Sequence, residues 1–283
     1  MTKISFITDS TAYLPDDFVK KNKITVVPLN LHWDENVYKD NVDITAQAFY
    51  ERLEKSESTP STSQPSAGEF MEAYKEAAKG ADAVVAVLIS SGISGTVNSA
   101  LLAKNEFKDV PVEVIDSKVT SAGLVFILKA LIAKAEKGAK VDELVKTAGD
   151  VIDTLGIYFV VDTLKYLHKG GRIGGASAFL GSALDLKPIL FLNKEGTIDA
   201  LEKVRTKKKA VKRLVEIAVE KAGGKKAFVG VLHANAPQEA EALKAELASQ
   251  IDCVEIALHP ISPVIGTHTG PGTLGVVVHT TQY

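Results

Sequence analysis

Short runs of β-branched and aromatic residues alternate with longer segments of helical periodicity, and this alternation is the main constraint on the fold. Several runs are apolar at consecutive positions, which is typical of strands covered on both faces. The predicted strands are 3–8, 24–31, 83–89, 112–115, 157–161, 189–192, 227–232 and 254–258. The predicted helices are 46–55, 68–79, 96–107, 124–137, 141–155, 206–222 and 238–249. Such alternation predicts an α/β fold of βαβ units with a mainly parallel sheet.

Two segments interrupt the alternation. Residues 56–66 are serine, threonine, proline and other polar residues, a composition that favours a flexible linker over an ordered loop presenting hydroxyl groups to a site. Residues 167–178 contain four glycines and follow a predicted strand, which indicates a domain boundary near residue 155 or a loop facing an interdomain cleft. We therefore expect two α/β domains, 1–155 and 156–283, with the mainly parallel sheet in the first and a ligand site in the cleft between them.

Composition limits the function classes. The chain has 33 lysines and arginines against 35 acidic residues, so it lacks the broad excess of positive charge typical of nucleic-acid-binding proteins. Cys253 is the only cysteine, which excludes a disulfide framework or a cysteine-based metal site. No apolar run approaches the roughly 20 residues needed to span a bilayer, and the first apolar stretch is too short for a secretory signal. We expect a cytoplasmic protein with no metal or cofactor that binds a small molecule or a protein.

Polar residues collect where five of the predicted strands end. In an open α/β sheet, ligands bind beyond the carboxyl ends of the strands, so these loops are candidate sites. The same residue types also cap the helices that follow, and each one alone is more often a cap. Five together favour a site. The five groups are Thr8-Asp9-Ser10, Ser90 to Thr96, Asp116-Ser117, Asp162-Thr163 and His233-Ala234-Asn235.

The loop from Ser90 to Thr96 is the sharpest of these candidates. Ser94, Gly95 and Thr96 are expected to open a helix, where unpaired backbone N–H groups favour an anion. The loop has no lysine or arginine, so it suits one carboxylate better than a polyphosphate. The alternative is a serine hydrolase or phosphatase with Ser94 as nucleophile. That alternative lacks the glycine two residues after the serine that a nucleophile elbow requires, because position 96 is threonine.

Further candidates lie toward the C-terminus. Residues 262–273 are rich in glycine and proline and present His268, whose charge can change near neutral pH. The run from Lys203 to Arg213 holds seven cations and no acid, which indicates a solvated helix face or a docking surface for an acidic or phosphate-bearing partner. Arg172 lies among the glycines at 170–175, and its planar guanidinium could hold a phosphoryl group.

Taken in order along the chain, these segments resemble one protein family, the DegV family, over about residues 3–282. The matching segments are Thr8-Asp9-Ser10, Thr62-Ser63-Gln64-Pro65-Ser66, 90–100, Asp116-Ser117, Lys169-Gly170-Gly171-Arg172-Ile173-Gly174, Lys187-Pro188-Ile189-Leu190 and His268-Thr269-Gly270-Pro271-Gly272.

The resemblance implies a non-catalytic protein that binds a long-chain fatty acid, such as palmitate, stearate or oleate, in a buried tunnel. By motif, Thr62 and Ser94 would contact the carboxylate, with the backbone N–H of Gly95 and His268 nearby, so that the segment 56–66 would be ordered. Some members resemble the fatty-acid-binding subunit of bacterial fatty acid kinase, in which a separate kinase subunit phosphorylates the bound acid for phospholipid synthesis. Arg172 and Arg205 would then be candidates for contact with that kinase or with the phosphoryl group.

Overall fold

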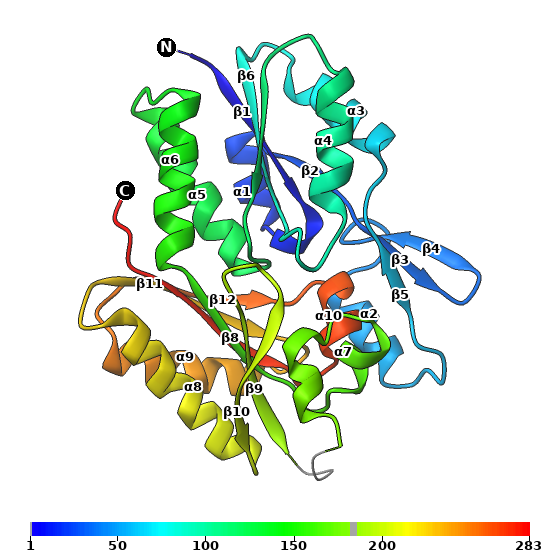
Figure 1. Ribbon diagram of the computed structural model, residues 1–283, viewed down its shortest axis with the longest axis vertical. Coiled ribbons are helices and arrows are strands. Elements are labelled where there is room, and N and C mark those ends of the chain that lie inside the picture. The colour runs from blue at the N-terminus through cyan, green and yellow to red at the C-terminus, as the bar shows by residue number, and fades with distance from the viewer. Residues whose placement is uncertain (1, 182–185) are drawn as a thin grey trace.

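The computed structural model describes residues 2–181 and 186–283 and has a mixed α/β fold (Figure 1). Its N-terminal part contains a four-stranded sheet in which every neighbouring pair is parallel, as the sequence predicts. The strand order is β2-β1-β6-β7. The bounds are β1 (Ile4–Asp9), β2 (Thr25–Val27), β6 (Ala83–Leu88) and β7 (Val112–Asp116).

Helices cover both faces of this sheet because its central strands are apolar at consecutive positions. The side chains of Val84, Ala86 and Leu88 belong to a buried cluster with α3 (Ala67–Ala77) and α4 (Thr96–Glu106). Val85 and Val87 belong to a second cluster with α5 (Ala122–Glu136) and α6 (Val141–Thr154). The apolar run 83–88 is therefore buried at all six positions.

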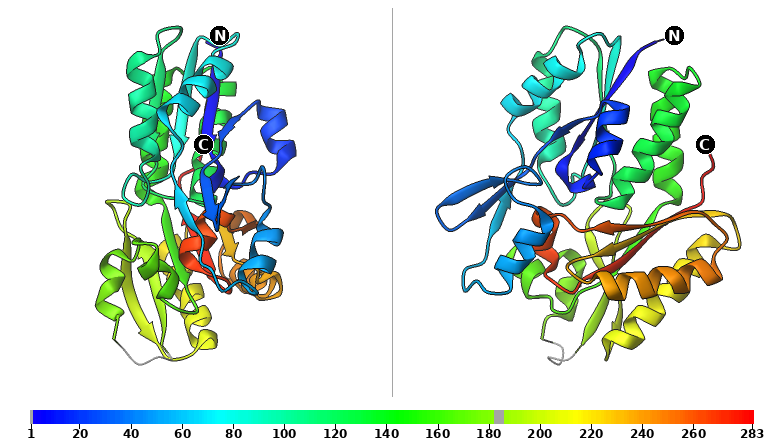
Figure 2. Two further views of the ribbon diagram at one scale, coloured as in Figure 1. Left: turned by 90° about the vertical axis from the view of Figure 1, so that its right-hand side faces the viewer. Right: turned by 180° about the vertical axis from the view of Figure 1, so that it is seen from behind.

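A six-stranded sheet of order β10-β9-β8-β13-β11-β12 occupies the C-terminal part. Only the β11–β12 pair is parallel in this mixed sheet. Helices α8 (Lys207–Ala222) and α9 (Pro237–Gln250) cover one of its faces (Figure 2). The strands are β8 (Gly156–Val160), β9 (Lys187–Leu192), β10 (Ile198–Val204), β11 (Ala227–His233), β12 (Cys253–Pro260) and β13 (Leu274–His279).

The helix α5 is buried on several sides because it lies between the two sheets. It contacts β1 and β6 of the parallel sheet and β11 of the mixed sheet. Every residue from Ala122 to Leu128 is buried, and a helix that is hydrophobic around most of its circumference is expected to lie in a core. The close approach to β11 is possible because Gly230 has no side chain there: a Cβ would lie 2.8 Å from that of Ala122.

A small antiparallel sheet of order β4-β3-β5 projects from the side of the molecule (Figure 1). Its strands are β3 (Asn30–Trp33), β4 (Asn36–Lys39) and β5 (Ser61–Ser63).

The prediction of a single strand at 24–31 is wrong: this segment divides into β2 and β3, which belong to different sheets. Pro28 lies between them, and a proline has no N–H with which to continue a ladder. The linker expected from the composition of 56–66 is also wrong, because β5 pairs with β3.

The remaining elements are short. Predicted helices are confirmed to within a few residues, whereas α1, α7, α10, β4, β5, β10 and β13 were not predicted. Their composition gives weak periodicity, and their stability depends on contacts with distant segments. The helices not yet located are α1 (Asp16–Asn22), α2 (Ala46–Leu53), α7 (Lys165–Lys169) and α10 (Pro263–Thr269), with 3₁₀ turns η1 (Ser10–Ala12) and η2 (Gly174–Phe179).

Buried contacts join the two parts of the chain. The hydroxyl of Tyr50 in α2 donates to the carbonyl oxygen of Ile261, at 3.1 Å. The buried carboxylate of Asp40 accepts from Ser10 Oγ at 2.7 Å and from the backbone N–H of Val264 at 3.4 Å. One hydrophobic cluster also contains side chains from both sides of residue 155. The division into domains 1–155 and 156–283 stays a prediction, and the two parts share a core.

We predict that Asp40→Asn changes how stability depends on pH. Burial raises the pKa of Asp40 to about 7. The folded chain then holds a proton that the unfolded chain releases, so the contribution of Asp40 to stability is present at low pH and is lost as the pH rises toward 7. The free energy of unfolding of Asp40→Asn relative to the unsubstituted protein should rise by about 1 kcal/mol per pH unit between roughly pH 5 and 7. Urea unfolding across this range measures the difference, with exposed Asp109→Asn as control. If the free energies of unfolding of the unsubstituted protein and of Asp40→Asn change in parallel with pH, the raised pKa of Asp40 is contradicted.

Candidate functional site

A largely apolar pocket lies where the carboxyl ends of the parallel strands meet one face of the mixed sheet. Counted out into the open solvent at its mouth, it contains about 780 Å³ of space that protein atoms do not fill. Its apolar walls come from both parts of the chain. They are formed by Leu29, Ile89, Ile93, Ile157, Phe159, Leu192, Ile198, Leu232, Ile261, Val264 and Ile265.

Four of the six predicted site residues line this pocket. Thr62 comes from β5, Ser94 from the loop after β6, Arg172 from the segment after α7, and His268 from α10. Gly95 lines a more polar opening beside the pocket, which also includes Ser94 and Arg172. The chain thus brings these five residues, which span more than 200 positions, to one region.

Arg205 lies apart from this group. It follows β10, is exposed, and belongs to the lining of neither the pocket nor the polar opening. Two other cations of the run 203–213 form ion pairs: Arg213 pairs with three glutamates, and Lys207 pairs with Asp162 and Glu239. Arg205 makes no ion pair with any residue that the structure describes. Arg205 can therefore contact a partner protein at the surface, but it is not placed to contact a ligand inside the pocket.

His268 and Thr62 form a hydrogen-bonded pair in the pocket wall. Thr62 Oγ1 and His268 Nε2 are 2.7 Å apart. Burial, with the nearby charge of Arg172, lowers the pKa of His268 to about 4, so the ring is neutral near pH 7 in place of the titrating group that the sequence suggested. A neutral imidazole carries one N–H. If Nε2 carries it, the ring donates to Thr62, and the threonine hydroxyl is free to donate to an acid.

Ser94 lies at the start of α4 without a basic partner. Its Oγ is 2.8 Å from Thr96 Oγ1, and Gly95, the N-cap of α4, has no side chain to cap the first turn. A bound anion can therefore approach the helix N-terminus. No described residue is placed to take a proton from Ser94, because Nε2 of His268 is engaged with Thr62. The geometry does not favour Ser94 as a nucleophile.

Close contact between β5 and the start of α4 holds Thr62 and Ser94 on the same side of the pocket. A Cβ at residue 95 would lie 3.0 Å from the side chain of Gln64, so only glycine allows this approach without displacing the amide. Gln64 itself lines the pocket beside Thr62.

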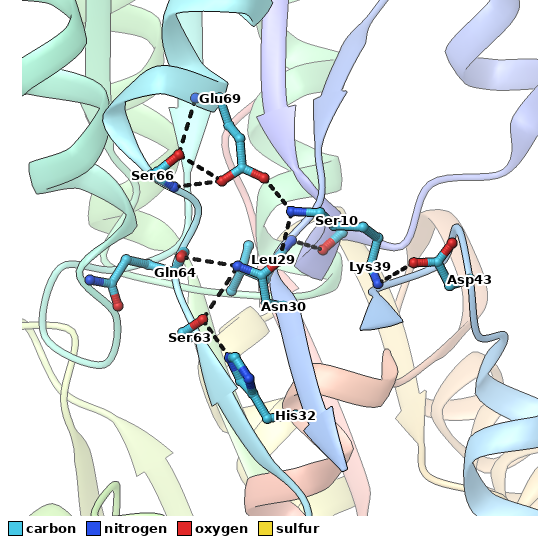
Figure 3. A network of polar contacts seen from close by, with 10 residues as sticks. All are labelled: Ser10, Leu29, Asn30, His32, Lys39, Asp43, Ser63, Gln64, Ser66 and Glu69. Carbon is cyan, nitrogen blue, oxygen red and sulfur yellow. Dashed lines mark hydrogen bonds and ion pairs between the residues drawn. The ribbon is translucent and has the colours of Figure 1, made fainter. Parts of the chain in front are cut away.

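A polar network fixes β5 in this position (Figure 3). Ser63 Oγ is 2.8 Å from His32 Nε2 and accepts from Asn30 Nδ2 at 3.3 Å. The same amide group of Asn30 donates to the carbonyl oxygen of Gln64. These bonds explain how a strand of serine and threonine is ordered: its stability comes from the neighbouring strand and not from burial of its own side chains.

The next turn of the chain is fixed by a capping box. Ser66 caps α3 by accepting from the N–H of Glu69, whose carboxylate accepts in return from the N–H of Ser66 (Figure 3). Lys39 of β4 contacts both Glu69 of α3 and Asn30 of β3, so it links the start of α3 to the sheet that contains β5. Serines that composition assigns to a linker are therefore structural contacts.

Arg172 is held by two backbone carbonyl groups. Its Nε donates to the oxygen of Ile93 at 3.1 Å, and its Nη1 donates to the oxygen of Gly170 at 2.8 Å. These bonds place the guanidinium between the pocket and the polar opening, beside Ser94. It is the one side chain of the pocket lining that carries a full charge near neutral pH among the residues described.

The polar groups at strand ends mostly support the site. Asp9 accepts from the N–H of Ile89 at 2.6 Å and so fixes the start of the loop that carries Ser94. Asp116 accepts from the N–H of Ser91 at 3.0 Å and holds the same loop from the other side. Neither carboxylate lines the pocket. Of the five predicted groups, the one containing Ser94 contributes the ligand-facing residues, and Asp9 and Asp116 position it.

Five hydroxyl residues of the pocket lining were not among the predicted site residues: Ser63, Thr120, Ser121, Thr269 and Thr273. Of these, Thr120 and Ser121 are buried, in the loop between β7 and α5. They follow Asp116-Ser117 at the carboxyl end of a predicted strand, so the strand-end rule could have identified them. The apolar walls have no comparable signal, because alternate residues of the same strand face the pocket and the opposite core.

The comparison with known sequences decides the family. A family model named DegV, described as an uncharacterised protein of the DegV family, matches residues 3–281. This chain belongs to the DegV family. The DegV domain-containing protein SCO2569 of Streptomyces coelicolor is 40% identical over 277 residues, covering 97% of this chain and 98% of the relative.

Solved structures of DegV proteins share the fold. A DegV family protein from Thermus thermophilus, described with fatty acid binding, matches with a TM-score of 0.93 and 35% identity, covering 99% of this chain and 100% of the other. DegV of Bacillus subtilis, described as a fatty acid binding protein, matches with a TM-score of 0.92 and 34% identity, with the same coverage. The DegV proteins most similar in structure thus include fatty acid binding proteins.

No helix in residues 2–181 and 186–283 is long and apolar enough to cross a membrane. Over the same ranges, no group of three or more His, Cys, Asp or Glu side chains could hold a metal ion.

We predict that Gly170→Ala disturbs the Thr62–His268 pair. The backbone of Gly170 has φ −79°, which alanine adopts freely, but a Cβ would lie 2.1 Å from His268 Nδ1. The ring must move, and overpacking of this kind costs about 1–3 kcal/mol. Urea unfolding should therefore show lower stability. Gly149→Ala in α6 is the matched control, because it has open space and should raise stability by up to about 1 kcal/mol. Equal stabilities for the two variants would contradict the steric account.

Proposed function

We propose that this DegV protein binds one long-chain fatty acid, such as palmitate, stearate or oleate, in the pocket. Its carboxylate lies at Thr62, Ser94 and the backbone N–H of Gly95, with His268 behind Thr62. The observation that carries the proposal is one apolar-walled pocket that is lined by Thr62, Ser94 and His268 and lies beside a polar opening shared by Ser94 and Gly95. The fatty acid binding described for the Thermus thermophilus and Bacillus subtilis proteins supports it.

The acyl chain supplies most of the affinity in this proposal. Each buried methylene contributes about 0.8 kcal/mol, so roughly 15 methylenes offer on the order of 12 kcal/mol before the costs of binding. The hydroxyl groups of Thr62 and Ser94 supply orientation and distinguish an acid from an alkane. Arg172 offsets the charge of the carboxylate from the rim of the pocket.

We further propose a non-catalytic role, in which the protein presents the acid to a separate kinase subunit in the cytoplasm for phospholipid synthesis. A carboxylate oxygen would form a bond to the terminal phosphorus of the donor held by that kinase, and the bond from phosphorus to the nucleoside diphosphate would break, giving an acyl phosphate. The polar opening beside Ser94 and Arg172 offers an approach for the donor. Exposed Arg205 is the candidate for contact with the kinase surface.

We predict that Thr62→Val combined with Ser94→Ala weakens fatty acid binding. Each substitution removes a hydroxyl that bonds to a charged carboxylate, a contact worth about 1.5–3 kcal/mol, so the dissociation constant for palmitate should rise by at least about a hundredfold. Native mass spectrometry of the purified protein and titration of the delipidated protein measure retention and affinity.

Ser249→Ala, at the exposed end of α9, is the matched control and should bind palmitate as the unsubstituted protein does. Unchanged affinity in the double variant, with the fold intact by circular dichroism, would reject the carboxylate site. A delipidated protein that binds neither palmitate nor oleate would reject fatty acid binding itself.

We predict that Arg205→Ala separates binding from phosphorylation. Because Arg205 lies outside the pocket lining, its removal should leave palmitate affinity unchanged but reduce acyl phosphate formation with the kinase subunit by about tenfold. Arg172→Ala should lower both quantities. Lys108→Ala, an exposed cation beyond α4, is the control. If Arg205→Ala gives an unchanged rate of acyl phosphate formation when the concentration of this protein limits the reaction, Arg205 does not contact the kinase.

A further inference from the structure

Thr120 and Ser121 differ from the other hydroxyl residues of the pocket. Five hydroxyl side chains in the lining have hydrogen-bond partners: those of Thr62, Ser63, Ser94, Thr269 and Thr273. Thr120 Oγ1 and Ser121 Oγ have none among the described residues. The two residues are 8% and 3% exposed, so bulk water does not satisfy them. An unpaired buried hydroxyl is costly, and two adjacent ones need an explanation.

The backbone at Ser121 adds a second, independent cost. Its φ is 54° and its ψ is −132°, a conformation that residues with a side chain rarely adopt and that glycine adopts without strain. Serine occupies this position although its hydroxyl has no protein partner. Strain of this kind at a ligand-lining residue points to a functional constraint on the side chain.

Thr120 and Ser121 line the pocket itself, and they do not reach the polar opening at the N-terminus of α4. The polar opening is lined by Ser94, Gly95 and Arg172 but not by Thr120 or Ser121. The first turn of α5, which directly follows Ser121, lies against the apolar wall: a Cβ at residue 123 would lie 3.3 Å from Ile157 Cδ1. An acid whose carboxylate is held in the opening by Ser94 and the backbone N–H of Gly95 would place its chain, and not its head, against the two hydroxyl groups.

We propose that Thr120 and Ser121 bind an oxygen carried on the acyl chain, so that the ligands of this pocket include hydroxylated fatty acids. This inference rests on the proposed binding of a fatty acid. A ligand hydroxyl can donate to one of the two side chains and accept from the other, and rotation about each Cα–Cβ bond directs the protein hydroxyl toward it. A plain hydrocarbon chain leaves both side chains unpaired.

The ligand oxygen is neutral in this proposal. The walls around the two residues include Ile89, Ile157 and Phe159, and the one cation of the described lining, Arg172, belongs to the opening. A second carboxylate buried there would have no opposite charge, which is far more costly than burying a hydroxyl. The site would therefore distinguish hydroxylated chains both from chains that carry no hydroxyl and from dicarboxylic acids.

The test uses the delipidated full-length protein and a series of stearates with one hydroxyl at successive mid-chain carbons. Affinity should depend on the position of the hydroxyl: one position should bind at least as tightly as stearate, and distant positions about tenfold or more weaker, because their hydroxyl is buried without a partner. In the variant Thr120→Val with Ser121→Ala, the favoured position should lose its advantage by about tenfold, and stearate should bind more tightly.

Ser121→Gly provides a second variant that relieves the backbone strain while removing the hydroxyl, and it should reduce the same advantage. Ser249→Ala should keep the positional preference. The proposal is overturned if the unsubstituted protein binds every hydroxystearate much more weakly than stearate, a result that decides the matter even if a variant fails to fold. It is also overturned if the affinity ratio is unchanged in a folded variant. Failure of stearate itself to bind would instead reject the proposed function.

Discussion

The fold depends on burying α5 between two sheets. This helix is apolar on most of its circumference, and a single sheet covers only one side of it. The parallel sheet and the mixed sheet together supply the missing cover, and that arrangement turns an apolar face of the mixed sheet toward the carboxyl ends of the parallel strands. The pocket is the part of this shared core that side chains do not fill. Apolar walls left without contact there favour an apolar ligand, since protein interiors are otherwise close-packed.

Buried polar residues around this core act mainly by holding loops in place. Asp9 and Asp116 fix the two sides of the loop that carries Ser94, and Asp40 fixes the start of α10, which carries His268. None of these carboxylates lines the pocket. A motif residue can therefore be important to a ligand site without touching the ligand, and the network around β5 in Figure 3 does the same for Thr62.

The sequence predicts the parts of the fold whose stability is local. The run 83–88 is apolar at every position, and the helices at 68–79 and 141–155 carry their own periodicity, so their types and approximate bounds are confirmed. The strand β5 could not be identified from composition, because three polar residues become a strand only through pairing with β3. Motif resemblance placed Thr62, Ser94 and His268 in one site, whereas the pocket walls depend on which face of each strand meets the cavity, and no local pattern specifies that.

The chemistry of the opening suits a protein that releases its ligand. Hydroxyl groups and backbone N–H groups orient a carboxylate with modest energy, and the depressed pKa of His268 keeps the ring neutral, so that no fully desolvated ion pair forms with it. Arg172 lies at the rim, where its charge is shared with the polar opening. In the proposed function, affinity would come from the acyl chain, which would be held by contacts that carry little directional preference. In the same proposal, the head group would stay accessible to a second protein, and transfer of the acid would not require a buried charge pair to be broken.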